Sequence, residues 1–243
     1  MPINSEVSID LTNTRFAGSS FPFEAVLWDM DGTLIDSEPI WISQERELMN
    51  SLGVNWSESD AIHCIGGPMT RVDAYMRAKL DAQQQELYPS MALTALLLER
   101  MEQELPKAVS FAPGSEALLR EINNLSISQG LVSASSRALV NAGLSFVGSD
   151  FFKVSISNDD VEFSKPHPEG YQKAAQSLGV NIENCLILED SVTGVTAAIE
   201  SGAYVLGIPH VTDLPKGKKV VHRKSLLDLD VNGLVHIFSE AQG

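Results

Sequence analysis

The chain has 243 residues, 44% hydrophobic and 20% charged, which is the composition of a globular protein rather than of a disordered or fibrous one. Acidic residues outnumber basic ones by 32 to 17, and the formal net charge of −15 argues against binding to nucleic acid or to anionic membrane surfaces. Two cysteines suit a reducing compartment. Residues 1–20 lack the pattern of a signal peptide, and no apolar run reaches the ~18 residues of a membrane span, so we expect a cytoplasmic protein.

Strand and helix patterns follow one another from residue 23 onward. Residues 1–22 form a polar N-terminal tail, and the apolar run over 23–28 has the length and composition of a buried strand. A helical pattern comes next, with Ser37 as its capping residue and Pro39 in its first turn, and Gly53 ends it.

Between about residues 57 and 105 the strand signals vanish, and helices are predicted over 69–80 and 91–105. The alternation then resumes, with helices over 115–125, 136–147, 169–178 and 192–201 and strands over 127–133, 152–156, 185–189 and 204–208. This alternation predicts an α/β fold with a doubly wound parallel sheet. The helical block indicates a cap domain over 40–107, inserted into a core domain formed by 23–39 and 108–243.

Polar and charged side chains follow the predicted strands at the points where those strands end. Because the carboxyl ends of parallel strands share one edge of the sheet, we expect these side chains to converge. They are, in chain order, Asp29, Asp31, Ser133, Ser135, Lys165, Glu189 and Asp190. Several carboxylates at one edge suit a hard cation such as magnesium, which takes a few protein carboxylates together with waters and substrate phosphate.

The same residue types fit the chemistry of phosphoryl transfer. Asp29, held at the end of a strand, is a candidate nucleophile, because a carboxylate can form an aspartyl phosphate. Asp31 could turn toward the leaving group and carry its proton. A serine near the start of the helix from Ser136 would offer its hydroxyl and backbone N–H groups to a phosphate, and Lys165 would neutralise the approaching anions. Each motif alone is also typical of a turn, a loop or a helix cap, so the prediction depends on their order along one edge.

Together these residues resemble the four motifs of the haloacid dehalogenase superfamily. The motifs are Asp29-Met30-Asp31-Gly32-Thr33-Leu34, Ser133, Lys165-Pro166 and Leu188-Glu189-Asp190-Ser191. The likeness runs from about residue 23 to the C-terminus. The segments 23–28, 36–39 and 188–194 are similar to the branch with a small helical cap, which contains β-phosphoglucomutase and the sugar-phosphate phosphatases, including those acting on 2-deoxyglucose 6-phosphate.

The resemblance implies a role for each matching residue. Asp29 would be the nucleophile and Asp31 the general acid and base. Ser133 would bind the transferring phosphoryl group, and Lys165 would be the stabilising ammonium. Because the resembled dehalogenases lack an acid two residues after the nucleophile, the presence of Asp31 favours phosphoryl transfer over carbon–halogen cleavage.

The cofactor implied by the resemblance is magnesium (Mg²⁺). It would be held by Asp29, the backbone carbonyl of Asp31 and Asp190, with Glu189 beside or within that shell.

The twelfth residue after the candidate nucleophile separates two activities. The resembled mutases have a histidine there, which helps to couple cap closure to the substrate, whereas this chain has Trp41. Mutases also favour valine at the position of Thr33. We therefore predict a magnesium-dependent phosphatase of small phosphorylated metabolites, above all sugar phosphates, with an aspartyl-phosphate intermediate. A hexose phosphomutase and a non-catalytic binding protein on the same scaffold stay open as alternatives.

Four further residues are candidates for contact with the substrate. Ser135 lies in the predicted phosphate loop, and Arg137 follows it and is either a substrate contact or a helix-surface charge. Arg71 lies where the resembled caps place a substrate-gripping loop, with a solvated arginine as the alternative. Trp41 could stack on a sugar or pack as a hinge aromatic. A closing cap disfavours phosphoprotein substrates and favours small molecules. We also expect the protein to be a monomer.

Overall fold

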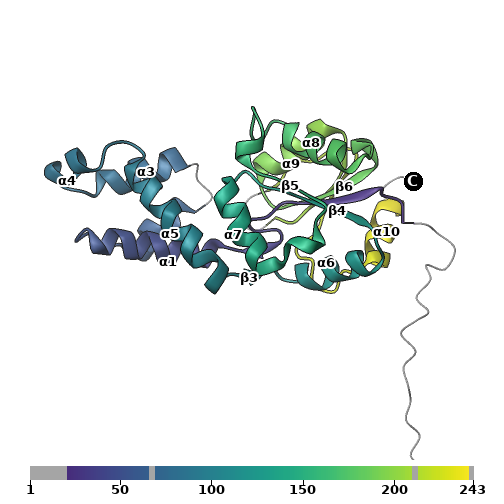
Figure 1. The fold of residues 1–243 in the computed structure, drawn as a ribbon, viewed down its shortest axis with the longest axis horizontal. Coiled ribbons are helices and arrows are strands. Elements are labelled where there is room, and N and C mark those ends of the chain that lie inside the picture. The colour runs from purple at the N-terminus through teal and green to yellow at the C-terminus, as the bar shows by residue number, and fades with distance from the viewer. Residues whose placement is uncertain (1–20, 66–68, 210–212, 241–243) are drawn as a thin grey trace, which may run out of the picture.

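A six-stranded sheet forms the centre of the protein in the computed structural model, which describes residues 21–65, 69–209 and 213–240 (Figure 1). Nearly all of the predicted tail, 1–22, therefore lies outside the described residues. The strand order is β5-β4-β1-β6-β7-β8, and every pairing is parallel. The strands are β1 (Ala25–Trp28), β4 (Ser128–Val132), β5 (Val154–Ile156), β6 (Cys185–Glu189), β7 (Tyr204–Gly207) and β8 (Val220–His222).

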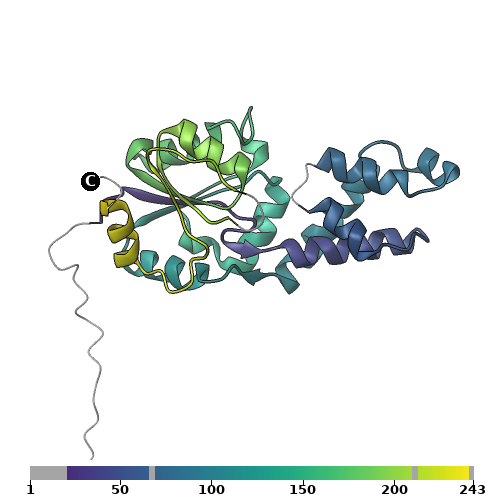
Figure 2. The same ribbon diagram turned by 180° about the vertical axis from the view of Figure 1, so that it is seen from behind.

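Helices cover both faces of this sheet, as Figures 1 and 2 show. Val26 and Trp28 of β1 belong to one apolar cluster, shared with α6, α7 and α10, while Ala25 and Leu27 belong to a second, shared with α8 and α9. These helices are α6 (Ser115–Asn124), α7 (Arg137–Val147), α8 (Glu169–Leu178), α9 (Val192–Ser201) and α10 (Val231–Glu240). Burial on both faces explains why β1 is a continuous apolar run. The predicted α/β fold with a doubly wound parallel sheet is confirmed.

Five helices of the described chain lie to one side of the sheet (Figure 1). In the sequence they come between β2 (Ile35–Asp36) and β3 (Ser110–Phe111), two short strands that pair antiparallel. They are α1 (Glu38–Ser51), α2 (Glu58–Cys64), α3 (Met69–Ala78), α4 (Ala82–Leu87) and α5 (Ala92–Ala108). They enclose an apolar cluster of their own, which includes Met49, Trp56, Met76 and Leu97. We refer to α1–α5 as the helical insertion. The division into a core domain and a cap domain stays a proposal.

Several short elements were not predicted. The strands β2 and β3 have two residues each, which is too short for an alternating pattern to be visible. Edge strand β8 is half-buried and follows a lysine-rich loop, and α2 and α4 have seven and six residues. Among the helices in the described part of the chain, none combines the length and the apolar character that a membrane span requires.

Candidate active site

The sheet register brings the ends of three strands together. Trp28, the last residue of β1, pairs with Leu131 of β4 on one side and with Leu188 of β6 on the other. The N–H of Asp29 extends the ladder by donating to the carbonyl of Leu188 at 3.0 Å. The N–H of Ser133 likewise donates to Ile156 O at 2.9 Å. The side chains that follow β1, β4 and β6 therefore meet at one edge.

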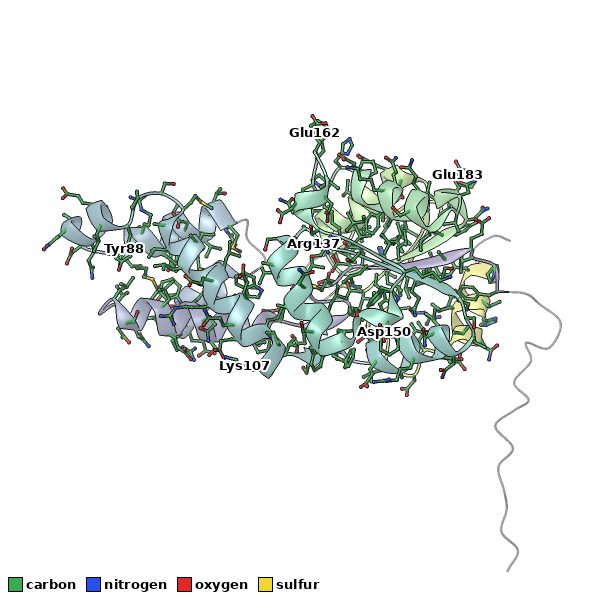
Figure 3. All side chains as sticks on the ribbon, in the orientation of Figure 1. Tyr88, Lys107, Arg137, Asp150, Glu162 and Glu183 are labelled. Carbon is green, nitrogen blue, oxygen red and sulfur yellow. The ribbon has the colours of Figure 1, made fainter. Side chains whose placement is uncertain are left out.

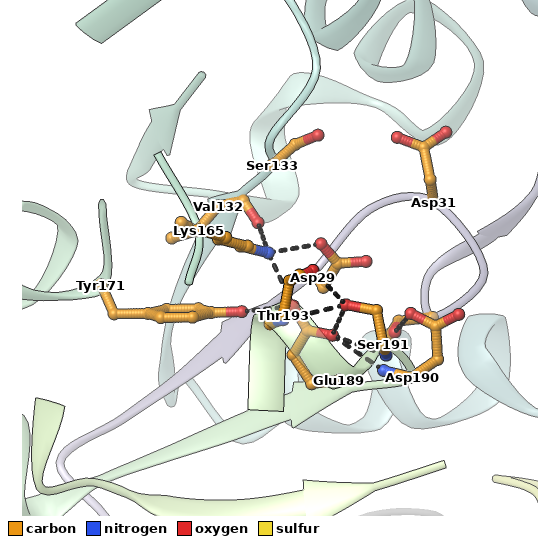
Figure 4. A network of polar contacts seen from close by, with 12 residues as sticks. Asp29, Asp31, Val132, Ser133, Lys165, Tyr171, Glu189, Asp190, Ser191 and Thr193 are labelled. Carbon is orange, nitrogen blue, oxygen red and sulfur yellow. Dashed lines mark hydrogen bonds and ion pairs between the residues drawn. The ribbon is translucent and has the colours of Figure 1, made fainter. Parts of the chain in front are cut away.

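Lys165 is the cation at this edge, and its ammonium group has three acceptors (Figure 4). Its Nζ lies 2.5 Å from Asp29 Oδ1, 2.7 Å from Glu189 Oε1 and 3.0 Å from the carbonyl oxygen of Val132. The side chain of Lys165 is only 7% exposed. Since an ammonium carries three protons, all of its donors are used, and Lys165 is fixed between two buried carboxylates.

Glu189 is held from both of its oxygens. Oε1 accepts from Lys165 and from the hydroxyl of Tyr171 at 2.9 Å. Oε2 accepts from the N–H of Asp190 and the N–H of Ser191, both at 3.0 Å, and from Ser191 Oγ at 3.1 Å. The last three donors precede α9, where the helix dipole favours a negative charge. Glu189 is thus a fully buried anion with five donors.

Asp190 lies against the loop that follows β1. Thr33 Oγ1 donates to Asp190 Oδ1 at 3.2 Å. Gly32 has a φ of +89°, and a Cβ atom at this position would overlap with the Asp190 carboxylate. The loop therefore requires glycine both for its backbone conformation and for the close approach of Asp190.

The carboxylates fit a hard metal cation. Asp29, Glu189 and Asp190 each offer an oxygen within 4.8 Å of the others. Burial, followed by the charge of Glu189, raises the pKa of Asp29 well above its ordinary value, although Lys165 opposes this shift. Burial alone would lower the pKa of Lys165, but the charges of Asp29 and Glu189 raise it well above the ordinary value. One ammonium thus faces three acidic groups, and an oxygen-binding cation would balance the remaining charge. Because both oxygens of Glu189 already accept hydrogen bonds, Asp29 and Asp190 are the better placed ligands.

Asp31 lies outside this network; no dashed line in Figure 4 joins it to the other residues drawn. Its Oδ1 accepts from Ser37 Oγ at 2.7 Å, and its Oδ2 accepts from Ser135 Oγ at 2.9 Å. Ser37 occupies the predicted cap position of α1, but its hydroxyl makes no capping bond to the helix. The hydroxyl is used on Asp31 instead. Ser37 is a site residue that sequence reasoning missed, since a serine before a helix is typical of a cap.

The loop 133–136 precedes α7 and contains the two predicted phosphate-loop serines. Ser133 is buried, and its Oγ accepts from the N–H of Ser135 at 3.0 Å. The carbonyl of Ser135 accepts from the N–H of Asn158 at 2.9 Å. The loop is thus fixed by its own bonds and by the segment after β5. It lies where a phosphate could contact Ser133 and the start of α7.

The structure does not bring Arg137 into contact with Asp29, Glu189 or Asp190. The guanidinium donates to Ser155 Oγ and to Ser155 O, both at 2.9 Å, and forms an ion pair with Asp160. A substrate contact by Arg137 would require these bonds to be exchanged.

Arg71 and Trp41 belong to the helical insertion. Arg71 is exposed on α3, and its Nη2 donates to Ile65 O at 3.2 Å. Residues 66–68 of the predicted substrate-gripping loop lie outside the described residues. Trp41 is half-buried on α1 and packs against the apolar cluster of the insertion and against one cluster of the sheet. Trp41 thus lies at the junction between the two parts.

An open parallel sheet with an aspartate, a lysine and further carboxylates at its carboxyl edge defines an α/β enzyme that binds its ligand at that edge. The model of the haloacid dehalogenase-like hydrolases matches residues 26–208. The chain belongs to this family, as its motifs predicted.

Curated relatives agree with this assignment, and a solved structure shares the fold. Hexitol phosphatase B of Escherichia coli is 35% identical over 72% of this chain and 78% of its own length. The bifunctional riboflavin kinase/FMN phosphatase of Arabidopsis thaliana is 29% identical over 90% of this chain, which spans about 55% of that relative. The crystal structure of CbbY from Rhodobacter sphaeroides in complex with phosphate is 23% identical, with a TM-score of 0.70 over 88% of this chain and 99% of that one. The predicted enzyme class, phosphoric monoester hydrolase, is confirmed at the level of the family.

Proposed function

We propose that the protein is a magnesium-dependent phosphatase of small phosphorylated metabolites, with sugar and sugar-alcohol phosphates as its main substrates. The observation that carries the proposal is the contact of Lys165 Nζ with Asp29 Oδ1 at 2.5 Å, beside two further carboxylates. A buried aspartate paired with a lysine is a nucleophile whose charge is balanced while an anionic phosphate approaches.

The reaction has two steps, and side chains at this edge carry out both. A carboxylate oxygen of Asp29 attacks phosphorus and forms an aspartyl phosphate, and the bond between phosphorus and the substrate oxygen breaks. Asp31 gives its proton to that leaving oxygen. Water then attacks phosphorus, Asp31 takes the proton of the water, and inorganic phosphate leaves while Asp29 is regenerated. Ser133 binds the phosphoryl oxygens.

The ligands we assign to magnesium are Asp29, Asp190 and the backbone carbonyl of Asp31, with Glu189 next to them. When bound, the ion supplies positive charge to the phosphoryl group and to the nucleophile, as divalent cations do in phosphoryl transfer. Lys165 holds Asp29 in place, and Thr33 with Gly32 positions Asp190.

The substrate class rests on the relatives and on the chemistry of the edge. The matched relatives include a hexitol phosphatase and an FMN phosphatase, both named for small phosphate monoesters. Within the described residues the edge carries three carboxylates, the ammonium group of Lys165 and the hydroxyl of Ser133. The helical insertion beside it is the element we expect to select the rest of the substrate.

Phosphate release tests the proposal. The purified protein is incubated with hexose phosphates, hexitol phosphates, FMN and nucleoside monophosphates, with magnesium and with EDTA. We expect release from at least one sugar or sugar-alcohol phosphate in magnesium alone. Asp29→Asn should remove the activity. The matched control is Asp150→Asn, which changes an exposed acid that precedes β5 and so lies away from the carboxyl edge of the sheet (Figure 3). Activity that survives EDTA, or survives Asp29→Asn, would contradict the proposed mechanism.

A further inference from the structure

Tyr171 contacts both Lys165 and Glu189, which form a buried ion pair at the active edge (Figure 4). It lies on α8 and is fully buried. Its hydroxyl donates to Glu189 Oε1 at 2.9 Å. The centre of its ring lies 4.9 Å from Lys165 Nζ, within the range of a cation–π contact. A tyrosine hydroxyl could be satisfied by many buried acceptors, but here it meets the same oxygen that accepts from Lys165.

That shared oxygen matters because Lys165 has two anionic partners. Its ammonium lies 2.5 Å from Asp29 Oδ1 and 2.7 Å from Glu189 Oε1, so the two carboxylates compete for one cation. A donor on Glu189 Oε1 withdraws negative charge from this oxygen and weakens its attraction for Lys165. The same bond fixes the orientation of the Glu189 carboxylate.

We propose that Tyr171 is a positioning residue for phosphoryl transfer, which keeps Lys165 on Asp29 by orienting Glu189 and limiting its pull on the ammonium. The inference rests on the proposed function, in which Asp29 is the nucleophile. Tyr171 does not touch the substrate and acts only through Glu189 and Lys165. Without its hydroxyl, Lys165 moves toward Glu189 and Asp29 loses its counter-charge.

The helical insertion contains the same three-residue arrangement without a nucleophile. The hydroxyl of Tyr75 donates to Asp60 Oδ1 at 2.6 Å, Lys79 Nζ contacts the same oxygen at 2.6 Å, and Nζ lies 4.9 Å from the Tyr75 ring. Lys79 is 38% exposed, and Asp60 is its one ion-pair partner among the described residues. Tyr75→Phe therefore deletes an equivalent hydroxyl where no second carboxylate competes for the lysine, and it is the matched control.

Tyr171→Phe keeps the ring and removes only the hydroxyl. With a sugar or sugar-alcohol phosphate that the wild type hydrolyses, we expect kcat to fall about tenfold and KM to stay within about twofold. Tyr75→Phe should leave both constants within about twofold of the wild type. Thermal melting checks that both variants fold. A kcat of Tyr171→Phe within twofold of the wild type, or an equal loss in Tyr75→Phe, would overturn the proposal.

Two further measurements separate a positioning role of Tyr171 from a general loss of stability, and neither depends on the melting temperature of Tyr171→Phe. In the Glu189→Gln background the competing charge is absent, so adding Tyr171→Phe should change kcat by less than about twofold; a full tenfold loss there would refute the inference. Crystals of Tyr171→Phe should show Lys165 Nζ further from Asp29 Oδ1 than in the wild type, with its contact to Glu189 kept. An unchanged separation would also refute it. This readout needs no activity, so it stays decisive even if the wild type hydrolyses no phosphate ester and the proposed function fails.

Discussion

Replacement of Asp29 by asparagine should separate activity from stability. The amide has the shape of the carboxylate but is a poor nucleophile, so the aspartyl phosphate cannot form. Loss of a nucleophile leaves only the rate enhancement that binding and charge stabilisation supply, and we expect the phosphatase rate to fall by at least about 10⁴-fold. Such a loss alone would not distinguish a chemical role from misfolding.

Without metal, by contrast, the Asp29→Asn variant should be at least as stable as the wild type. Burial and the charge of Glu189 raise the pKa of Asp29 well above its ordinary value, so the ionised side chain disfavours the folded state. A raised folded-state pKa gives a stability contribution that is present at acid pH and is lost as the pH rises. Asparagine removes that dependence, and Lys165 keeps its contact with Glu189. At pH 7.5 in EDTA we expect the free energy of unfolding of Asp29→Asn to equal that of the wild type or to exceed it by about 1–2 kcal/mol.

Urea unfolding of both proteins in EDTA, at pH 4.5 and at pH 7.5, measures this difference. The advantage of Asp29→Asn should shrink at the lower pH, because a raised folded-state pKa of Asp29 makes the wild type more stable toward acid pH. Magnesium at about 100 times its dissociation constant should stabilise the wild type by about 2.7 kcal/mol and the variant by less. Hydrolysis above about 1% of the wild-type rate, or destabilisation of the variant by more than about 2 kcal/mol in EDTA, would refute this account of Asp29.

Three other perturbations test separate parts of the structure. EDTA should abolish activity, magnesium should restore it and calcium should inhibit, because calcium prefers longer bonds and more ligands; phosphate release with each ion checks this. Gly32→Ala should displace Asp190 and weaken magnesium binding by at least about tenfold in calorimetry, whereas Gly53→Ala, with φ +80° and open space around it, should not. Burial raises the pKa of Glu45 on α1 to about 7, and its buried Oε2 has no hydrogen-bond partner. The free energy of unfolding should therefore fall by roughly 1–2 kcal/mol between pH 5.5 and 8.5. In urea unfolding, Glu45→Gln should flatten this dependence on pH.

The sheet and the edge that carries the motifs were predictable because local pattern and global fold agree. Three elements, α8, β6 and α9, have the predicted bounds, since each combines a clear apolar pattern with a stop signal such as Gly179 or Gly202. Parallel pairing then places Asp29 and Glu189 at one edge without further information. The short strands and short helices were missed, since two to seven residues do not establish a period. Helix α10, which has ten residues, was missed as well.

Second partners of the site residues were not predictable, because they depend on side-chain directions between distant segments. Tyr171 was visible only as an aromatic on an apolar helix face, yet it meets Glu189. Ser37 matched a cap pattern and instead holds Asp31. Arg137 follows the phosphate loop in sequence, but the helix start directs it to Asp160. In each case a polar group pairs with a charged side chain that the local sequence pattern does not indicate and that only three-dimensional packing determines.

Trp41 leads to the last prediction, which concerns the fate of the phosphoryl group. A mutase must keep its phosphoenzyme away from water while a sugar turns and takes the phosphoryl group back. Trp41 packs against the apolar clusters of the insertion and of the sheet. Its indole has one N–H donor and no titratable group, so it cannot carry a proton or replace the charge coupling of a histidine at this position. Water, activated by Asp31, should therefore take the phosphoryl group. We expect any hexose phosphate that is accepted to give inorganic phosphate and free sugar at every turnover, and a hexose bisphosphate primer should not divert the product. Phosphorus NMR follows both products; an isomeric hexose phosphate that accumulates with little free phosphate would show that the enzyme transfers the group to a sugar instead.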